Sequence, residues 1–497
     1  MDVMVVFDKL FKWVQGIIAF VLSLIIPTLP AASVIGYGGY EPIVATQREY
    51  RFDIDRFNVG GYGYNLALSD DEHFAQIKEA GLDFLVTSVN DALLDYCDEN
   101  GIGIVAHGLN TKSGYIWRFN PDSVLNLTKE SFKDRPCLWG DSIIDEPCST
   151  EFDKVAKAVD HYYSLGTKTL PLVNLLPNYF KEDQAGFSYP EYTDKQTQIA
   201  SLLRNTPVRR DIVPILTMFN EELYNKIAMV DYCLTEQYDL YKQYVSNYIS
   251  KVDTDVICVD FYPMQQYDTT TFTWLNNLDV LAEACRETGR KLWIHTQTCG
   301  GKTPDEADGR RFCDNVEDIR YQTYVSLAFG AKAVIHACYS SGWWDPDAWL
   351  INKRGEKTAT FDAVKQTNEE IAAFTDLYAN YDYKGTFFKN GHMADGTGFY
   401  AYLSPVSRED RGCEIDDFDS VKDHILAGCF KAKQGNSRAY TFVNMNGKFR
   451  GAKAYCDVTF DDAKQITVYQ KGVATVIDGN ELSLKLDCEE GVFVKVE

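Results

Sequence analysis

Eight apolar segments, each followed by a helical segment or a long connection, constrain the fold of this chain more than any other feature. They lie at 57–65, 82–90, 102–110, 138–147, 168–178, 255–264, 291–301 and 331–341. Strands that alternate with helices are joined by right-handed parallel crossovers, and eight such units are the number that closes into a barrel. An open doubly wound sheet is the alternative, but no phosphate-binding helix start follows the glycines of the first segment. The sequence therefore predicts an α/β protein built on a (β/α)8 TIM barrel.

The last quarter of the chain has a different texture. Short alternating runs such as 464–472 and 481–487 are broken by Gly, Asn and Asp, which is typical of an antiparallel β-sandwich. This domain concentrates no catalytic residue types, so we expect it to be accessory. The predicted organisation is a signal peptide or membrane anchor at 1–36, a lead-in segment at 37–56, a catalytic barrel at 57–380 and a β-sandwich at 381–497.

The N-terminus indicates export. After Lys9 and Lys12 comes VQGIIAFVLSLIIPTLPAASVI, a stretch without charged residues that ends in small residues. Its prolines and small residues favour a cleaved signal, whereas its length favours a membrane anchor. Either reading predicts that the rest of the chain lies outside the cytoplasm, secreted or attached to the cell-surface membrane.

Charge and cysteine usage exclude several classes of partner. The net charge of -23 argues against nucleic acid, because an acidic surface repels phosphate. The 13 cysteines include no C-x-x-C pair and no Cys/His cluster at zinc spacing, so we expect neither a metal nor another cofactor. Most cysteines are expected to be buried small hydrophobes rather than a disulfide framework.

Polar and aromatic residues collect where the eight predicted strands end, and in a barrel that rim carries the chemistry. The candidate site residues are Tyr62, Asn65, His107, Asp145, Glu146, Asn174, Asp260, Tyr262, His295, Gln297, Tyr339, Trp343 and Trp344. Carboxylates and amides suit sugar hydroxyls, and tryptophan rings stack on the C–H faces of sugars. We therefore expect a carbohydrate substrate.

Several motifs together resemble the clan-A glycoside hydrolases, most closely the β-galactosidase-like branch of families 35 and 42. They are WGDSIIDEP at the fourth strand, FYP at the sixth, RYQTYVSLAFGAKAV leading into the eighth, the tryptophans after it and the sandwich behind. The resemblance implies a glycosidase acting on β-linked glycans, with Glu146 as general acid/base. The clan places its nucleophilic Glu at the end of the seventh strand, where this chain has Gln297 in WIHTQTCGG. An amide cannot form a covalent glycosyl-enzyme.

Three hypotheses remain for the second half of the mechanism. Asp260 is the best-placed second carboxylate, with Glu306 or Asp308 less well placed. Alternatively, Asp145 and Glu146 form a pair similar to that of N-acetylhexosaminidases that use the acetamido group of the substrate as nucleophile. In the third hypothesis the barrel is a non-catalytic carbohydrate-binding surface protein. That hypothesis gains if Asp145 faces outward, for example toward Arg135, and no second carboxylate lies within reach of Glu146.

Overall fold

The structure is a computed structural model of the whole chain. It describes residues 40–107, 132, 134–178, 238–264, 271–298, 301–302, 310–311, 313, 315–390, 414–415, 417–419, 423–446 and 453–497. The proposed export segment lies outside these residues, and so do Glu306 and Asp308. In the described part of the chain, no helix has the length and apolar character needed to span a membrane.

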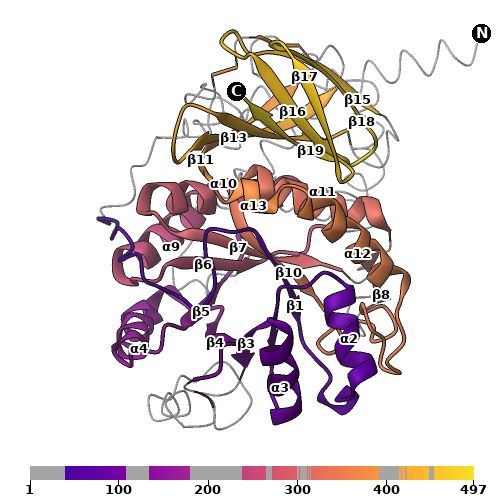
Figure 1. Cartoon of the computed structure of the whole chain (residues 1–497). Coiled ribbons are helices and arrows are strands. Elements are labelled where there is room, and N and C mark those ends of the chain that lie inside the picture. Colours follow the sequence, from indigo (N-terminus) through magenta and orange to yellow (C-terminus); the bar gives the residue numbers. More distant parts are fainter. Residues whose placement is uncertain are drawn as a thin grey trace, which may run out of the picture.

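Eight parallel strands form a closed barrel, which confirms the fold predicted from the alternating segments (Figure 1). The strands are β1 (Asn58–Tyr62), β2 (Phe84–Thr87), β3 (Gly103–His107), β4 (Leu138–Asp145), β5 (Leu170–Leu175), β6 (Val256–Asp260), β7 (Lys291–Gln297) and β10 (Ala331–Ala337). Each strand pairs with its sequence neighbours, and β10 closes the ring against β1. Each of the eight falls within one of the eight apolar segments, because strands buried on both faces read as apolar runs.

Helices surround the barrel (Figure 1). The described ones are η2 (Leu66–Leu68), α2 (Asp71–Glu79), α3 (Asp91–Asn100), η4 (Ser149–Glu151), α4 (Phe152–Ser164), α9 (Tyr238–Lys251), α10 (Thr271–Thr288), α11 (Val316–Ala328), α12 (Ala359–Ala372) and α13 (Thr375–Tyr378). Side-chain caps start several of them: Asn90 accepts a bond from Leu93 N, and Asn315 accepts one from Asp318 N. A two-stranded ribbon of β8 (Gly301–Lys302) and β9 (Arg310–Arg311) lies between β7 and α11.

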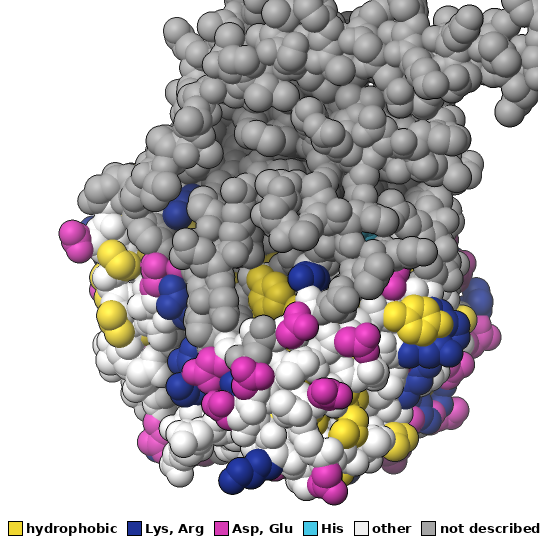
Figure 2. Space-filling model, turned by 90° about the horizontal axis from the view of Figure 1, so that it is seen from above, with side chains coloured by type: hydrophobic (Ala, Val, Ile, Leu, Met, Phe, Trp, Pro, Cys, Tyr) yellow, Lys and Arg dark blue, Asp and Glu magenta, His cyan; other side chains and the backbone are white. Residues whose placement is uncertain are grey.

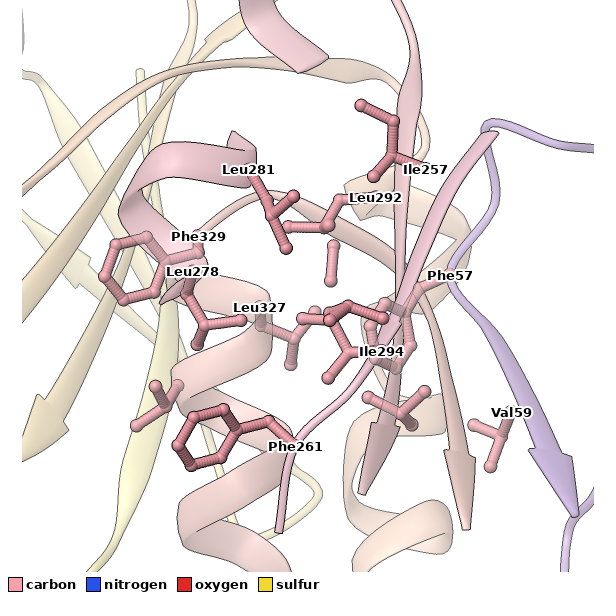
Figure 3. Packing of buried hydrophobic residues seen from close by; sticks show 14 of the residues in the cluster. Phe57, Val59, Ile257, Phe261, Leu278, Leu281, Leu292, Ile294, Leu327 and Phe329 are labelled. Atoms are coloured by element: carbon pink, nitrogen blue, oxygen red, sulfur yellow. The ribbon is translucent and has the colours of Figure 1, made fainter. Parts of the chain in front are cut away.

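Large side chains pack on both faces of the barrel sheet, inside the barrel and between its strands and the surrounding helices. Inside, Trp139 stacks on Phe52 with ring centroids 4.4 Å apart, so the lead-in segment packs into the interior cluster. Outside, Leu278 and Leu281 of α10 pack toward Leu292 of β7 (Figure 3). Burial of this apolar surface holds the helices against the strands and fixes where the strand ends meet.

A β-sandwich follows the barrel, as predicted, and lies above it in Figure 1. Its strands are β11 (Tyr381–Asn390), β12 (Asp417–Asp419), β13 (His424–Ala432), β14 (Arg438–Asn444), β15 (Ala454–Thr459), β16 (Gln465–Gln470), β17 (Val473–Asp478), β18 (Glu481–Leu486) and β19 (Gly491–Val496). They form a six-stranded and a three-stranded sheet with a hydrophobic cluster of their own. Nine of the described cysteines are thiols outside any disulfide, and Cys429 of β13 is disulfide-bonded.

Helix α11 joins the two domains. Its residues 318–328 are all buried, because one face lies on the barrel and the other on the sandwich. Thr386 of the sandwich donates a 2.7 Å bond to the carbonyl of Ala328. At Gly428 a Cβ atom would lie 2.1 Å from that same carbonyl oxygen, so the close approach requires glycine. The helix leading into β10 is therefore held from both sides.

The described surface is mixed in charge. On the face shown in Figure 2, acidic and basic side chains are interspersed, and hydrophobic side chains are exposed only in small separate groups. Small exposed hydrophobic groups of this kind are normal on the surface of a folded protein.

Candidate active site

Three carboxyl groups and one amide meet at the C-terminal end of the barrel. Asn174 of β5 donates its side-chain N–H groups to Asp145 at 2.9 Å and to Asp260 at 2.7 Å. The nearest oxygens of these two carboxylates are therefore no farther apart than the sum of the two distances. Glu146 follows Asp145 directly, and both aspartates act on its ionisation. A second and a third carboxyl group thus lie within electrostatic reach of the predicted general acid.

Strand register explains why these side chains converge. Asp145 pairs with Asn174, and Asn174 pairs with Cys258, whose side chain belongs to the interior cluster. Paired residues on neighbouring strands share a face of the sheet, and so do residues two apart on one strand. Asp145, Asn174 and Asp260 therefore all face the barrel interior. Arg135, considered above as an outward partner of Asp145, instead contacts Asp95 and Asp98.

The backbone turns sharply at Glu146. Its φ of 46° lies in the left-handed region, which is uncommon for a residue with a side chain. The N–H group of Glu146 donates to the Asn174 carbonyl at 2.8 Å, and the Tyr244 hydroxyl of α9 donates to the Pro147 carbonyl at 2.7 Å. Tyr244 also accepts a 3.3 Å bond from Leu176 N. Helix α9 thereby ties together the chain segments that follow β4 and β5.

Tyr244→Phe is expected to loosen this turn. It removes the partner of two buried backbone groups, which costs about 1–3 kcal/mol for each unsatisfied group. Unfolding by denaturant should show lower stability, and the turnover number of any reaction that uses Glu146 should fall. Tyr248→Phe on the same helix is the matched control, because that hydroxyl contacts Thr254 at 3.2 Å instead of the turn. Equal turnover in both variants would contradict a role of Tyr244 in holding Glu146.

The carboxyl cluster is electrostatically arranged to hold a proton on Glu146. Burial, followed by the negative charges of Asp260 and Asp145, raises the pKa of Glu146 to about 8. Burial also raises the pKa of Asp145, although the bond from Asn174 opposes that rise. Among the described residues no side chain donates a hydrogen bond to the Glu146 carboxyl group. The raised pKa favours the protonated form of the Glu146 carboxyl group at neutral pH.

Two histidines lie at the same end of the barrel, where His295 of β7 pairs with Asp260 of β6. Burial lowers the pKa of His107 to about 4, and burial together with the nearby His107 lowers that of His295 to about 3. Both rings are consequently neutral at physiological pH. Within the described part of the chain, one buried nitrogen atom of each ring and the side-chain oxygen of Asn174 have no hydrogen-bond partner.

Four aromatic side chains form one side of the site. Tyr62 lies edge-on to Trp343 with ring centroids 4.8 Å apart, and Tyr262 lies edge-on to Trp344 at 4.6 Å. Tyr62 also contacts His107 and His295, so the aromatic group adjoins the histidines. The indole of Trp349 donates a 2.8 Å bond to the Trp343 carbonyl, which fixes the loop that carries both tryptophans.

Three predicted site residues lie elsewhere or are already engaged. Tyr339 is fully buried and stacks on Tyr64, toward α2 and α3. Asn65 caps η2 by accepting a bond from Ala67 N. Gln297 is fully buried, and its side-chain amide bonds the backbone of Met264 in both directions at 3.0 Å.

Sequence reasoning missed Tyr244. Its neighbours Tyr241 and Tyr248 recur at helical spacing, which is the pattern of a buried helix face. No local signal distinguishes a tyrosine that packs from one that also bonds a distant turn. The bridging of two carboxylates by Asn174 was equally invisible, although Asn174 itself was expected in the site.

The described residues contain no group of three His, Cys, Asp or Glu side chains placed to hold a metal ion.

Comparison with known proteins found similarity only to solved structures of low sequence identity. A scan against protein-family models found no match, and neither did a search of curated proteins. Among solved structures, a glycoside hydrolase is 10% identical with a TM-score of 0.47, and covers 93% of this chain and 97% of its own. A β-galactosidase from Bacillus circulans sp. alkalophilus is 9% identical with a TM-score of 0.43 (90% and 100% covered). A family 30 subfamily 8 xylanase from Clostridium acetobutylicum is 11% identical with a TM-score of 0.39 (91% and 97% covered).

Proposed function

We propose that this protein is a glycoside hydrolase in which Glu146 protonates the glycosidic oxygen as the bond breaks. The observation that carries the proposal is the cluster of three carboxyl groups in the barrel mouth, in which burial and the charges of Asp260 and Asp145 raise the pKa of Glu146. Glycosidic cleavage needs this division of labour, because the leaving alkoxide requires a proton while the developing positive charge on the sugar requires a carboxylate.

The second carboxylate of the proposed mechanism is Asp260. Asn174 donates to it, which stabilises its ionised form and fixes its orientation. A carboxyl separation of roughly 5–5.5 Å favours attack by that carboxylate on the sugar, whereas one of roughly 6.5–9.5 Å leaves room for a water molecule. In the first case Glu146 protonates the leaving group and then, as a carboxylate, takes a proton from the water that hydrolyses the glycosyl-enzyme. In the second case Asp260 takes the proton from the attacking water, and Glu146 only protonates the leaving group.

A second candidate function is favoured by one specific observation. Asp145 faces the interior and is held by the same Asn174 amide, as an aspartate that orients a substrate acetamido group would have to be. Under this candidate, the protein cleaves N-acetylhexosaminides, and the substrate supplies its own nucleophile. A pure binding protein gains no support, because binding alone does not need a carboxyl group kept protonated next to two carboxylates.

Hydrolysis of a panel of aryl glycosides tests the proposal. The panel compares β-galactoside, β-glucoside and β-N-acetylglucosaminide, each with wild type and Glu146→Gln. Release from the plain hexosides, abolished in the variant, supports Asp260 as the second carboxylate. Release from the N-acetyl sugar alone supports the acetamido mechanism. Release that is unchanged in Glu146→Gln would contradict both.

The pH dependence of activity follows from the raised pKa of Glu146. Because the acid form is the active one, kcat/KM should be retained at neutral pH and fall as the pH rises through about 8. An ordinary glutamic acid would lose its proton, and the enzyme its activity, about 3.5 pH units lower, near the reference value of 4.5. A pH–rate profile on the best panel substrate measures this limb. Activity that declines above pH about 5 would contradict the assignment of Glu146 as the acid.

We further propose that the enzyme acts outside the cytoplasm. This rests on the apolar stretch VQGIIAFVLSLIIPTLPAASVI alone. N-terminal sequencing of the protein recovered from cell fractions distinguishes a cleaved signal from a retained anchor.

A further inference from the structure

We propose that Gln297 is a positioning residue: its amide fixes the segment that follows Asp260 at the end of β6 and carries Tyr262, and does not itself touch the substrate. The inference rests on the function proposed above. It also explains why an amide stands at the end of the seventh strand, where the clan-A glycoside hydrolases that this chain resembles have their nucleophilic glutamate.

The contacts of Gln297 are those of a clamp. Met264 N donates to the side-chain oxygen of Gln297 at 3.0 Å, and the Gln297 side-chain nitrogen donates to Met264 O at 3.0 Å. An amide can satisfy a backbone N–H and a backbone C=O at once, because it carries both a donor and an acceptor. Gln297 is 0% exposed and Met264 is 8% exposed, so water does not compete for these bonds.

The backbone of Gln297 is held by helix α11. Gln322 of α11 accepts a 2.8 Å bond from Gln297 N and donates a 2.8 Å bond to Gln297 O. Two amides in series therefore connect α11, the end of β7 and the segment that follows β6. Helix α11 is the element buried between the barrel and the sandwich, so this series starts from a rigid support.

The clamped segment is the one that matters for the site. Met264 lies four residues after Asp260 and two after Tyr262. Asp260 contacts Asn174, and the Tyr262 ring contacts Trp344. Fixing Met264 by both of its backbone groups restricts how far either side chain can move. Displacement of a reacting group by about 1 Å can cost roughly 100-fold in rate.

A glutamate at position 297 would work only when protonated. The neutral acid retains one O–H donor and one acceptor, but the carboxylate has no donor and would face the Met264 carbonyl. Gln297→Glu is therefore expected to match wild type near pH about 5 and to lose kcat by about 10- to 100-fold as the pH rises toward neutrality. Gln297→Leu removes both bonds and should show that loss at every pH.

Stability provides a readout that needs no substrate. In the folded protein, burial raises the pKa of the introduced carboxyl group above its unfolded value. The folded state then binds more protons than the unfolded state, so stability is retained at low pH and is lost as the pH rises. The melting temperature of Gln297→Glu should fall relative to wild type between pH 5 and 7, and hydrogen exchange should accelerate in residues 261–264.

The matched control is Asn446→Asp in the sandwich. Asn446 is also a buried amide with two bonds, accepting from His424 N at 2.9 Å and donating to Asp423 at 3.0 Å. The same amide-to-acid change should lower stability with rising pH there but leave kcat unchanged. The inference is overturned if Gln297→Glu keeps wild-type kcat and melting temperature at pH 7, if it is more active than wild type, or if Asn446→Asp lowers kcat equally. If wild type hydrolyses no glycoside, the proposed function falls, while melting and exchange still decide whether the clamp exists.

Discussion

Glu146→Gln is expected to lower kcat for an aryl glycoside with a poor leaving group by about 10²- to 10⁴-fold, the usual contribution of a general acid. The amide has no proton to give at the glycosidic oxygen. A dinitrophenyl glycoside needs little protonation, because its leaving group is already stable as an anion. The loss should therefore be much smaller with dinitrophenyl than with phenyl glycosides.

Two controls make this result specific. Glu151→Gln alters a glutamate five residues away, whose carboxyl group accepts a 3.3 Å bond from Cys148 N, and should leave kcat unchanged. Glu146→Gln should also fold well. Because the folded pKa of Glu146 is raised to about 8 from 4.5, its carboxyl group disfavours folding increasingly as the pH rises between these values. The variant should thus melt no lower than wild type at pH 8. An equal loss with both leaving groups would contradict the role of Glu146 as proton donor.

Asp260→Asn is expected to abolish turnover of plain hexosides, with a loss of about 10³- to 10⁵-fold, comparable to removal of other central catalytic groups. The asparagine side chain has the same size as Asp260 and still lies next to Asn174. It lacks the carboxylate that would stabilise the positive charge on the sugar or attack the sugar. It also removes a charge that raises the pKa of Glu146, so any residual activity should decline at a lower pH than in wild type.

Asp145→Asn is the matched variant, because the same Asn174 amide contacts both aspartates. If Asp260 is the second carboxylate, Asp145→Asn should be the milder change on plain hexosides. The reverse order on N-acetylhexosaminides would favour the acetamido mechanism. Wild-type turnover by Asp260→Asn on every active substrate would exclude Asp260 from the chemistry.

The sequence predicted the strands and helices that have a regular hydrophobic pattern, and it predicted the site residues that lie at the ends of those strands. Each barrel strand is an apolar run, and in a closed parallel barrel the strand ends must meet. Asp145, Glu146, Asn174 and Asp260 could therefore be expected at one rim from their positions alone. Their convergence is observed, and the bond pattern around Asn174 supplies its geometry.

The sequence could not predict side-chain contacts that depend on the path of the chain beyond a strand or on a distant part of the chain. Tyr339 lies two residues beyond β10, where alternation no longer fixes the direction of a side chain, and it faces the helices. Gln297 ends β7 and finds its partners in Met264 of another loop. Tyr244 reaches Pro147 from a helix almost a hundred residues later in the chain. Such contacts are set by tertiary packing, which local pattern does not encode.

One measurement bears most directly on whether Glu146 is the acid: the difference infrared spectrum between wild type and Glu146→Gln across pH. The difference is needed because burial also raises the pKa of Asp141, a second buried carboxyl group that contributes its own signal. At pH 6 the wild type should show the C=O band of a protonated carboxyl group that is absent from the variant, and this band should disappear as the pH passes about 8. A carboxylate band at pH 6, with no protonated group lost in Glu146→Gln, would contradict Glu146 as the proton donor.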